Sequence, residues 1–346
     1  MKVTVLGAGS WGTTLAIILH QNNFTTNCWS VEKTDIDNIQ KYGENKRFLP
    51  GISIPKSIEF TNSLEKSMNK ANVVIVAVPS HAVRSVLEKL KEYITSEMTW
   101  VSVAKGIENE TLLRVSEIIE KVGGIDKKNI AVLFGPSHAE EVSRGIPTAI
   151  VSASSYIKTA QLVQKLFMTS YFRVYANPDI IGVELGGCLK NVIAVAAGIC
   201  DGAGFGDNTK AALITRGLVE MNRLGVKLGA QPDTFAGLSG MGDLIVTCMS
   251  RHSRNRHVGE QIGKGRKLQE VLDEMVMVAE GVKTTQSVYK LAKRERIEMP
   301  ITIEVYKTLF EDKSPVQAMQ DLMTRASKIE DWVSSVRQGL CTDQDR

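Results

Sequence analysis

The first half of the chain alternates short apolar runs with longer charged stretches. Short apolar runs lie at residues 3–7, 72–79, 100–106, 129–136 and 148–153, and this part of the chain ends after residues 172–176. Runs without polar alternation are typical of strands buried on both faces of a parallel sheet, and the charged stretches between them have the length of helices. The pattern predicts a doubly wound α/β domain over residues 1–178.

From about Asp179 the strand-like runs stop. Residues 210–229 and 302–312 have helical periodicity, and an apolar stretch around Lys190 predicts a buried helix. We therefore expect an all-α second domain over residues 179–330. Residues 331–346 have no apolar periodicity and are expected to form a frayed polar tail.

Composition and charge narrow the class of protein. A chain of 346 residues that is 43% hydrophobic and 23% charged is long enough for two domains and has the composition of a soluble globular protein. Its net charge of +4 favours a small anionic ligand over nucleic acid, because nucleic-acid binding usually shows as a concentrated basic face.

The cysteines bear on compartment and on metal binding. Five cysteines are scattered without a C-x-x-C pair, which favours a reducing compartment over a disulfide framework. Cys248, His252 and His257 resemble a metal-ligand set, but arginines flank them and no fourth ligand is near, so we expect no metal site. The chain opens with a predicted strand, and no apolar run approaches the roughly 18 residues of a membrane span. We expect a cytoplasmic protein without a signal peptide or membrane segment.

A glycine-rich turn follows the first predicted strand. Gly7, Gly9 and Gly12 form G-x-G-x-x-G between that strand and a predicted helix over residues 13–21. In a dinucleotide-binding fold the first glycine makes the turn, the second lets the backbone approach the pyrophosphate, and the third packs helix on strand. The helix N-terminus then holds the phosphates. The alternative is a plain tight turn.

The choice between NAD and NADP is usually made about 20 residues further on. Glu32 would accept a hydrogen bond from a ribose 2′-hydroxyl and repel a 2′-phosphate, whereas the adjacent Lys33 could bind that phosphate. Both could equally be exposed residues that open the next helix. The cofactor expected is therefore NAD or NADP.

Three later stretches carry candidate chemistry. Lys105 and the turn Gly135-Pro136-Ser137 each follow the carboxyl end of a predicted strand, where ligands bind in open α/β sheets. The stretch "GLSGMGDLIVTCMSRHSRNRH" contains Asp243, Ser253, Arg254 and Asn255. Arg254 could form a fork to two phosphate oxygens, and its neighbours could add hydrogen bonds, which suits a phosphate monoester. The alternatives are a solvated basic loop and, for Asp243, an ordinary helix N-cap.

Lys190 is the most unusual residue. It stands in "VELGGCLKNVIAVAAGICDG", after the pair Gly186–Gly187 and before an apolar run. A buried lysine is paired, snorkels to the surface or does chemistry. The two glycines would let the backbone pass close to a substrate or cofactor.

Taken together, these motifs resemble bacterial NAD(P)-dependent glycerol-3-phosphate dehydrogenases over about residues 1–325. The resemblance rests on "LGAGSWGTTLA", "NKRFLPG", "VAVPSHAVR", "AKGIE", "FGPSHAEEV", "NPDIIGVELGGCLKNVIAVAAGICDG", "NTKAALITRG", "GLSGMGDLIVTC", "SRNRHVG" and "AEGVKT". It implies a Rossmann-type domain followed by an all-helical domain like that of 6-phosphogluconate dehydrogenase. It also implies an active site in the cleft between the domains, and a homodimer.

The resemblance also implies roles for individual residues. Lys190 would be the proton donor and acceptor, with Lys105 and Asp243 beside it in the catalytic group. The implied substrate contacts are Lys105, Gly135, Ser137, Lys190, Asn191, Asp243, Ser253, Arg254 and Asn255. The implied cofactor contacts outside the glycine turn are Ser10, Trp11, Lys105, Ala139, Arg254, Val278 and Glu280. In one departure, Val31 stands where the family commonly has an arginine that grips the adenosine phosphate, which agrees with the Glu32 argument for NAD.

The reaction so implied is the reduction of dihydroxyacetone phosphate to glycerol 3-phosphate, with Lys190 supplying the proton. A role in phospholipid synthesis is implied by the resemblance alone. Two alternatives remain open. One is a dehydrogenase of the same architecture that acts on a carboxylate substrate, such as a β-hydroxyacid dehydrogenase or a ketopantoate reductase. The other is a dinucleotide sensor without catalytic activity.

Overall fold

The computed structural model describes residues 1–275, 277–327 and 329–330, and it contains two compact units. The first unit comprises Met1–Lys105 and Arg114–Ile180, and the second comprises Gly106–Leu113 and the described residues from Ile181 onward. The 106–113 segment thus groups with the second unit, although it lies within the first domain predicted from sequence. The predicted polar tail, residues 331–346, lies outside the described residues.

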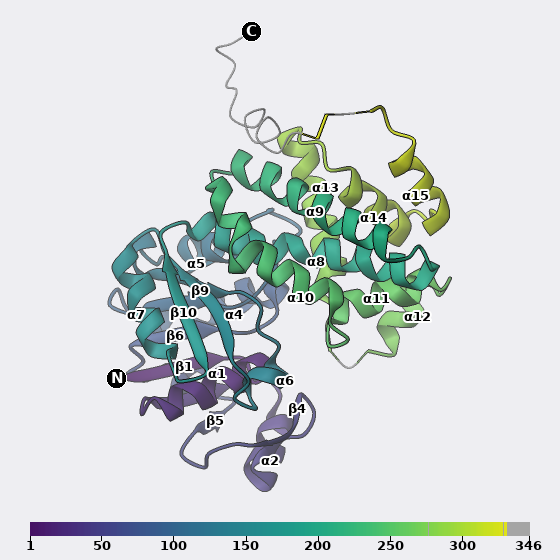
Figure 1. The fold of residues 1–346 in the computed structure, drawn as a ribbon. Coiled ribbons are helices and arrows are strands. Elements are labelled where there is room, and N and C mark those ends of the chain that lie inside the picture. The colour runs from purple at the N-terminus through teal and green to yellow at the C-terminus, as the bar shows by residue number, and fades with distance from the viewer. Residues whose placement is uncertain (276, 328, 331–346) are drawn as a thin grey trace, which may run out of the picture. The chain divides into compact units, whose positions relative to one another are not determined.

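An eight-stranded sheet forms the centre of the first unit. Its strands are β1 (Lys2–Leu6), β2 (Thr25–Trp29), β5 (Glu59–Thr61), β6 (Val73–Val76), β7 (Thr99–Ser102), β8 (Ile130–Phe134), β9 (Thr148–Ala153) and β10 (Phe172–Asn177). Their order is β10-β9-β8-β7-β6-β1-β2-β5. Figure 1 labels β10, β9, β6, β1 and β5 of this sheet. Every residue of β6, β7 and β8 is buried, as continuous apolar runs predict for central strands of a covered sheet.

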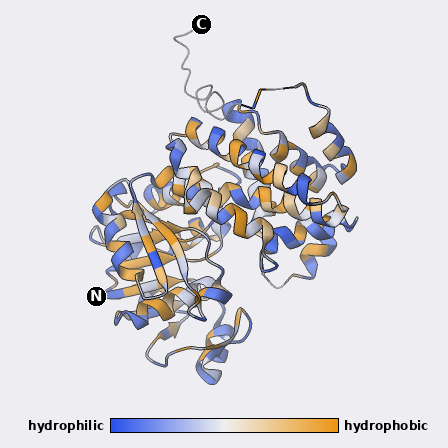
Figure 2. Cartoon of the chain, viewed as in Figure 1, coloured by the Kyte–Doolittle hydropathy of each residue, from blue (hydrophilic) through white to orange (hydrophobic). Residues whose placement is uncertain are grey.

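Helices connect most of these strands. They are α1 (Ser10–Gln21), α2 (Lys33–Tyr42), α3 (Leu64–Met68), α4 (Val83–Leu90), α5 (Val115–Gly123), α6 (Ala139–Val142) and α7 (Ile157–Phe167). In α4 the buried residues Val83, Val86, Leu87 and Leu90 follow the i, i+3, i+4, i+7 spacing of one helix face. Figure 2 shows that hydrophobic residues are concentrated in the strands. The helices contain both hydrophobic and hydrophilic residues.

The sheet differs from the parallel sheet predicted from sequence at one pair of strands. The pairs from β5 to β8 are parallel, but β8 and β9 pair antiparallel, and β10 then pairs parallel to β9. The connection after β8, residues 135–147, contains only the four-residue helix α6 and not the full-length crossover helix that usually joins parallel strands. A second small sheet, β3 (Glu44–Asn45) with β4 (Leu49–Ser53), was not predicted, because β3 has only two residues and β4 is mostly exposed and has no apolar run.

Every regular element described in the second unit is helical, as predicted. The helices are α8 (Ile180–Ala203), α9 (Asp207–Lys227), α10 (Asp243–Met249), α11 (Arg254–Gly263), α12 (Leu268–Asp273), α13 (Glu280–Glu295), α14 (Pro300–Phe310) and α15 (Pro315–Met323). Shorter turns, Pro232–Ala236 and the π-helical Leu238–Gly242, lead into α10. The core of this unit is built around α8, which is buried from Gly182 to Cys200.

Helix α8 corrects one expectation from sequence. By length and composition its 24 residues could cross a membrane, so the expectation that no apolar run approaches that length is wrong. However, 89% of its most apolar window is buried by the protein itself, as in the core helix of a soluble domain. Gly198 explains how neighbouring helices approach it, because a Cβ there would overlap the carbonyl oxygen of Arg256 in α11.

Candidate active site

The glycine turn of the first unit has a different constraint at each glycine. Gly7 has φ of +121°, and a Cβ there would lie 2.8 Å from the carbonyl of Ala77, so only glycine fits. A Cβ at Gly12 would overlap the carbonyl oxygen of Gly7, so this glycine permits close packing of α1 on the end of β1. Gly9 caps α1 without a side chain, and a Cβ there would meet nothing within 4 Å. The turn therefore presents a helix N-terminus beside open space, which suits a phosphate group.

Three predicted site residues meet after β7 and β8. Because these strands are parallel, their carboxyl ends lie on one edge of the sheet. The Nζ of Lys105 donates to the carbonyl oxygen of Gly135 at 3.3 Å, and the hydroxyl of Ser137 donates to the same oxygen at 3.0 Å. Gly135 has φ of +150°, and a Cβ there would lie 2.9 Å from Cα of Ile150. Two residues after Ser137, Ala139 is buried at the start of α6, which packs against α1.

The remaining candidates of the first unit lie at two helix starts. Ser10 and Trp11 open α1, and the ring of Trp11 packs toward Phe172 with 6.3 Å between centroids. A cofactor contact from Trp11 would therefore come from its backbone. Glu32 caps α2 without a side-chain hydrogen bond, and both it and Lys33 are exposed at the end of β2. Their exposure leaves either side chain able to meet a ligand.

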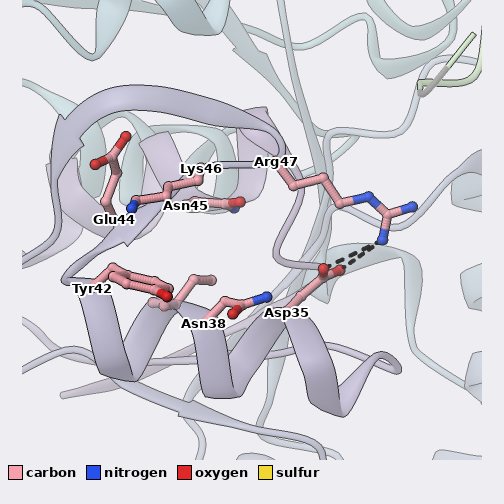
Figure 3. Close-up of a pocket in the computed structure, with 8 residues that line it drawn as sticks. Asp35, Asn38, Tyr42, Glu44, Asn45, Lys46 and Arg47 are labelled. Atoms are coloured by element: carbon pink, nitrogen blue, oxygen red, sulfur yellow. Dashed lines mark hydrogen bonds and ion pairs between the residues drawn. The ribbon is translucent and has the colours of Figure 1, made fainter.

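A pocket of about 300 Å³ lies between α2 and the β3–β4 hairpin (Figure 3). Asp35 and Arg47 form an ion pair at its edge, with 3.3 Å between Oδ1 and Nη1. The lining residues are Asp35, Asn38, Ile39, Tyr42, Glu44, Asn45, Lys46 and Arg47. None of them is a site residue predicted from sequence.

In the second unit, Lys190 is paired rather than snorkelled. The residue is 6% exposed, and its Nζ donates to Oδ1 of Asp243 at 2.9 Å and to Oγ1 of Thr247 at 2.6 Å. Thr247 in turn donates to the carbonyl oxygen of Asp243 at 2.6 Å. Asp243 is 2% exposed and comes directly after Gly242, which is the N-cap of α10. Its carboxylate therefore accepts a hydrogen bond from Lys190 and does not cap the helix. Thr247 was missed from sequence, although its i, i+4 spacing from Asp243 puts both on one helix face.

Asn191, next to the lysine, has a defined orientation. The backbone N–H of Gly281 donates to Oδ1 of Asn255 at 2.9 Å, so the amide nitrogen of Asn255 faces the other way. That nitrogen donates to Oδ1 of Asn191 at 2.9 Å. The remaining polar group of Asn191, its NH₂, is therefore the one that can donate to a ligand.

Ser253 and Arg254 open α11. The Ser253 hydroxyl accepts from the backbone N–H of Arg256 at 3.2 Å as the N-cap, and Nη1 of Arg254 donates to the carbonyl oxygen of Val278 at 2.9 Å. Val278 is exposed, and Glu280 two residues later begins α13. Among the described residues no carboxylate lies within ion-pair distance of Arg254. Arg256, by contrast, pairs with Asp201 at 2.8 Å, so the positive charge of Arg254 is the one left for an anion.

One expectation is modified by these contacts. Gly186 was expected to admit a substrate or cofactor, but a Cβ there would lie 2.7 Å from the carbonyl oxygen of Ser239, so packing of the π-helical turn already requires glycine. In the described part of the chain no group of three His, Cys, Asp or Glu side chains could hold a metal. Cys248 is buried, which raises its pKa to about 12 and keeps it a thiol rather than the thiolate that binds metals.

Comparison with known proteins identifies the same family in both units. Models described as the N-terminus and C-terminus of NAD-dependent glycerol-3-phosphate dehydrogenase match residues 2–160 and 179–320. The glycerol-3-phosphate dehydrogenase (NAD(P)+) of Chlorobium phaeobacteroides is 53% identical, over 95% of this chain and 99% of the relative. That of Bacillus pumilus is 51% identical, over 96% of this chain and 97% of the relative.

Solved structures agree with this similarity. The glycerol-3-phosphate dehydrogenase of Coxiella burnetii superimposes with a TM-score of 0.90 at 37% identity, over 94% of this chain and 99% of the other. A putative 2-dehydropantoate 2-reductase from Enterococcus faecalis has a TM-score of 0.57 at 15% identity, over 92% of this chain and 99% of the other. The second likeness concerns the fold alone.

Proposed function

The chain belongs to the NAD-dependent glycerol-3-phosphate dehydrogenase family, and we propose that it interconverts dihydroxyacetone phosphate and sn-glycerol 3-phosphate as an NAD(P)-dependent oxidoreductase. The observation that carries the assignment of its chemistry is the buried group of Lys190, Asp243 and Thr247. It supplies an ionisable amine whose position is held by two partners. The non-catalytic sensor is disfavoured, because such a protein would have no use for a buried ion pair of this kind.

When bound, the reduced nicotinamide supplies a hydride to the ketone carbon of the substrate. Lys190 then has one task, which is to deliver a proton from Nζ to the oxygen that becomes an alkoxide. Its positive charge stabilises the negative charge that develops on that oxygen before the proton moves. Asp243 compensates the buried ammonium, and Thr247 fixes the direction of Nζ. In the reverse reaction the neutral amine accepts the proton from the alcohol.

The substrate phosphate is assigned to Arg254, with Ser253 and Asn255 beside it at the start of α11. The uncompensated guanidinium supports this role, because it can form two parallel hydrogen bonds to a phosphate. The NH₂ of Asn191 serves as a donor to a substrate oxygen. In the first unit Lys105, Gly135 and Ser137 form a second group of substrate contacts, held together through the Gly135 carbonyl oxygen.

The cofactor is NAD or NADP, and the glycine turn is assigned to its pyrophosphate. The open space at Gly9 and the uncapped start of α1 support this, with backbone N–H groups of Ser10 and Trp11 available. Further cofactor contacts are assigned to Lys105, Ala139, Arg254, Val278 and Glu280. Glu32, with the exposed Val31 before it, favours NAD, whereas Lys33 favours NADP.

The decisive experiment follows the loss of reduced-nicotinamide absorbance with dihydroxyacetone phosphate, run in parallel with NADH and NADPH. Rapid oxidation supports the reaction, and a higher rate with NADH supports the role of Glu32. Ketopantoate and a β-keto acid serve as carboxylate controls and should not be reduced. Oxidation with a carboxylate substrate only would contradict the proposal, and so would cofactor binding without any turnover.

We also propose that the protein acts in the cytoplasm as a homodimer that supplies glycerol 3-phosphate for phospholipid synthesis. Four described cysteines, Cys28, Cys188, Cys200 and Cys248, are buried thiols outside any disulfide, which supports a reducing compartment. Light scattering would test the dimer, and cell fractionation would test the compartment. Growth of a deletion strain with and without added glycerol 3-phosphate would test the metabolic role.

A further inference from the structure

The chain passes between the two units at three places: after Lys105, after Leu113 and after Ile180. The first two crossings bound the 106–113 segment, which lies between β7 and α5 in sequence but belongs to the helical unit. This segment begins directly after Lys105, a residue assigned to substrate and cofactor. The contacts that hold the segment therefore also affect the position of the Lys105 backbone.

Three buried anchors fix the 106–113 segment to the helices. Ile107 is buried in the hydrophobic core of the second unit. The thiol of Cys188 in α8 donates to the carbonyl oxygen of Gly106 at 3.4 Å. The hydroxyl of Ser287 in α13 donates to the carbonyl oxygen of Ile107 at 2.8 Å, and it also contacts the side-chain amide of Asn109.

The segment is a closed loop rather than a slack connection. The N–H of Glu108 donates to the carbonyl oxygen of Leu113 at 3.0 Å, and the N–H of Leu112 donates back to Glu108 at 2.9 Å. Leu112 adopts φ of +59°, a left-handed conformation that a leucine rarely takes. Because these hydrogen bonds hold the loop in one shape, a shift of its anchors on α8 and α13 would also move the backbone at the ends of the loop.

We propose that Ser287 is a positioning residue, which holds the 106–113 segment and thereby fixes the backbone of Lys105. The inference rests on the function proposed above for Lys105. Lys105 is then held from two sides: its amine donates to Gly135 in the first unit, and its backbone continues into a loop anchored on the second. Since Cys188 lies two residues before Lys190 on α8, the same loop is bonded to the helix that carries the other lysine.

The test is a double-mutant cycle between Ser287→Ala and Lys105→Ala, with steady-state kinetics on dihydroxyacetone phosphate. Ser287→Ala alone should lower kcat/KM about tenfold, because displacement of a catalytic group by about 1 Å is enough to cost as much as 10²-fold. In the Lys105→Ala background the same substitution should change kcat/KM by less than about twofold, since its effect acts through that lysine. A purely structural role would give the same loss in both backgrounds.

Thr285→Val is the matched control. Thr285 lies two residues earlier on α13, and its buried hydroxyl donates to the carbonyl oxygen of Gly281 in the same helix, so this variant should keep normal kcat/KM. Asn109→Ala is the second variant, because it removes a side-chain contact of Ser287 from a half-buried position and should fold even if Ser287→Ala does not. It should show the same dependence on Lys105.

The outcomes separate this inference from the proposed function. Normal kcat/KM in Ser287→Ala and Asn109→Ala, with Lys105→Ala impaired, would overturn the inference and leave the function standing. Equal losses of kcat/KM upon Ser287→Ala in the wild-type and Lys105→Ala backgrounds would also overturn the inference and leave the function standing. Full activity in Lys105→Ala would overturn the role of that lysine, and the inference with it.

Discussion

Lys190 and Asp243 form an ion pair with 2.9 Å between Nζ and Oδ1, and both side chains are almost completely buried. They come from different helices, α8 and α10, and are 53 residues apart in sequence. A buried pair of this kind is weak evidence for stability, because desolvation of the two charges offsets much of their attraction. The ion pair in the helical core is therefore better explained by a role in catalysis than by a contribution to the stability of the fold.

The first prediction concerns turnover. Lys190→Ala should lower kcat for dihydroxyacetone phosphate by about 10²–10⁴-fold, the range that a general acid contributes. NADH binding, measured by fluorescence titration, should change little, because the glycine turn is untouched. Near-normal turnover in this variant would show that another group supplies the proton.

The second prediction concerns the stability of the pair. Asp243→Asn leaves the ammonium of Lys190 buried without a counter-charge and should lower the free energy of unfolding by about 3–5 kcal/mol. Adding Lys190→Met removes the stranded charge, so the double variant should recover most of that loss while staying inactive. Urea denaturation of the three proteins measures this. A double variant less stable than Asp243→Asn would argue that the pair itself stabilises the fold.

The third prediction separates two neighbouring arginines. Arg254→Ala should raise KM for dihydroxyacetone phosphate about 10–100-fold, because hydrogen bonds to a charged group contribute about 1.5–3 kcal/mol. Arg256→Ala is the control: its guanidinium pairs with Asp201 and Glu260, so it should lose about 1 kcal/mol of stability or less and keep its KM. Equal KM values for wild type and Arg254→Ala would remove this arginine from the phosphate site.

The sequence predicted the architecture well where periodicity decides it. Continuous apolar runs located the central strands, and the loss of such runs after Asp179 located the change to helices. The direction of β9 was not predictable from its composition, because a buried strand has the same apolar residues whichever way it runs. The lack of a full-length helix between β8 and β9 was the usable signal. The 106–113 segment was placed with the first unit because sequence order says nothing of which core Ile107 enters.

The candidate site was predictable as a set of residues but not as a set of bonds. Lys190 and Asp243 stood out as unusual charges near glycines, yet nothing in the sequence links positions so far apart. Thr247 was missed because a threonine inside an apolar helix is unremarkable by composition. Its bond to the lysine depends on how α8 and α10 pack, which requires glycine at Gly186 to admit the turn at Ser239.

The fourth prediction compares two glycines of the turn. Gly9 has φ of −73°, which alanine adopts, and a Cβ there meets no atom within 4 Å. Gly9→Ala should therefore change the free energy of unfolding by about 0.5 kcal/mol or less, but weaken NADH binding because the methyl group occupies space assigned to the pyrophosphate. Gly12→Ala should instead destabilise the protein by about 1–3 kcal/mol, since its Cβ overlaps the Gly7 carbonyl oxygen. Unchanged NADH affinity in Gly9→Ala would count against this cofactor site.

The last prediction concerns a carboxylate outside the active site. Glu220 in α9 is buried and accepts hydrogen bonds from the backbone N–H groups of Ile301, at 2.6 Å, and Thr302, at 3.1 Å, in the first turn of α14. Burial is the dominant influence and raises the pKa of Glu220 from 4.5 to about 7, against these hydrogen bonds and the smaller attraction of Arg223. The folded protein therefore keeps a proton here that the unfolded chain releases near pH 4.5.

The sign of the effect follows from linkage. Between pH 4.5 and about 7 the folded state binds more protons than the unfolded state, so the contribution of Glu220 to stability falls as pH rises and then levels off. A shift of this size corresponds to on the order of 3 kcal/mol. Glu220→Gln should be less stable than wild type at pH 5, because the glutamine amide has one acceptor oxygen and its NH₂ would face one of the two backbone N–H donors. The stability of this variant should not fall between pH 4.5 and about 7 as that of the wild type does. Urea denaturation at pH 5 and pH 8 tests it, and equal losses in both proteins between the two pH values would show that Glu220 is ionised in the folded state throughout.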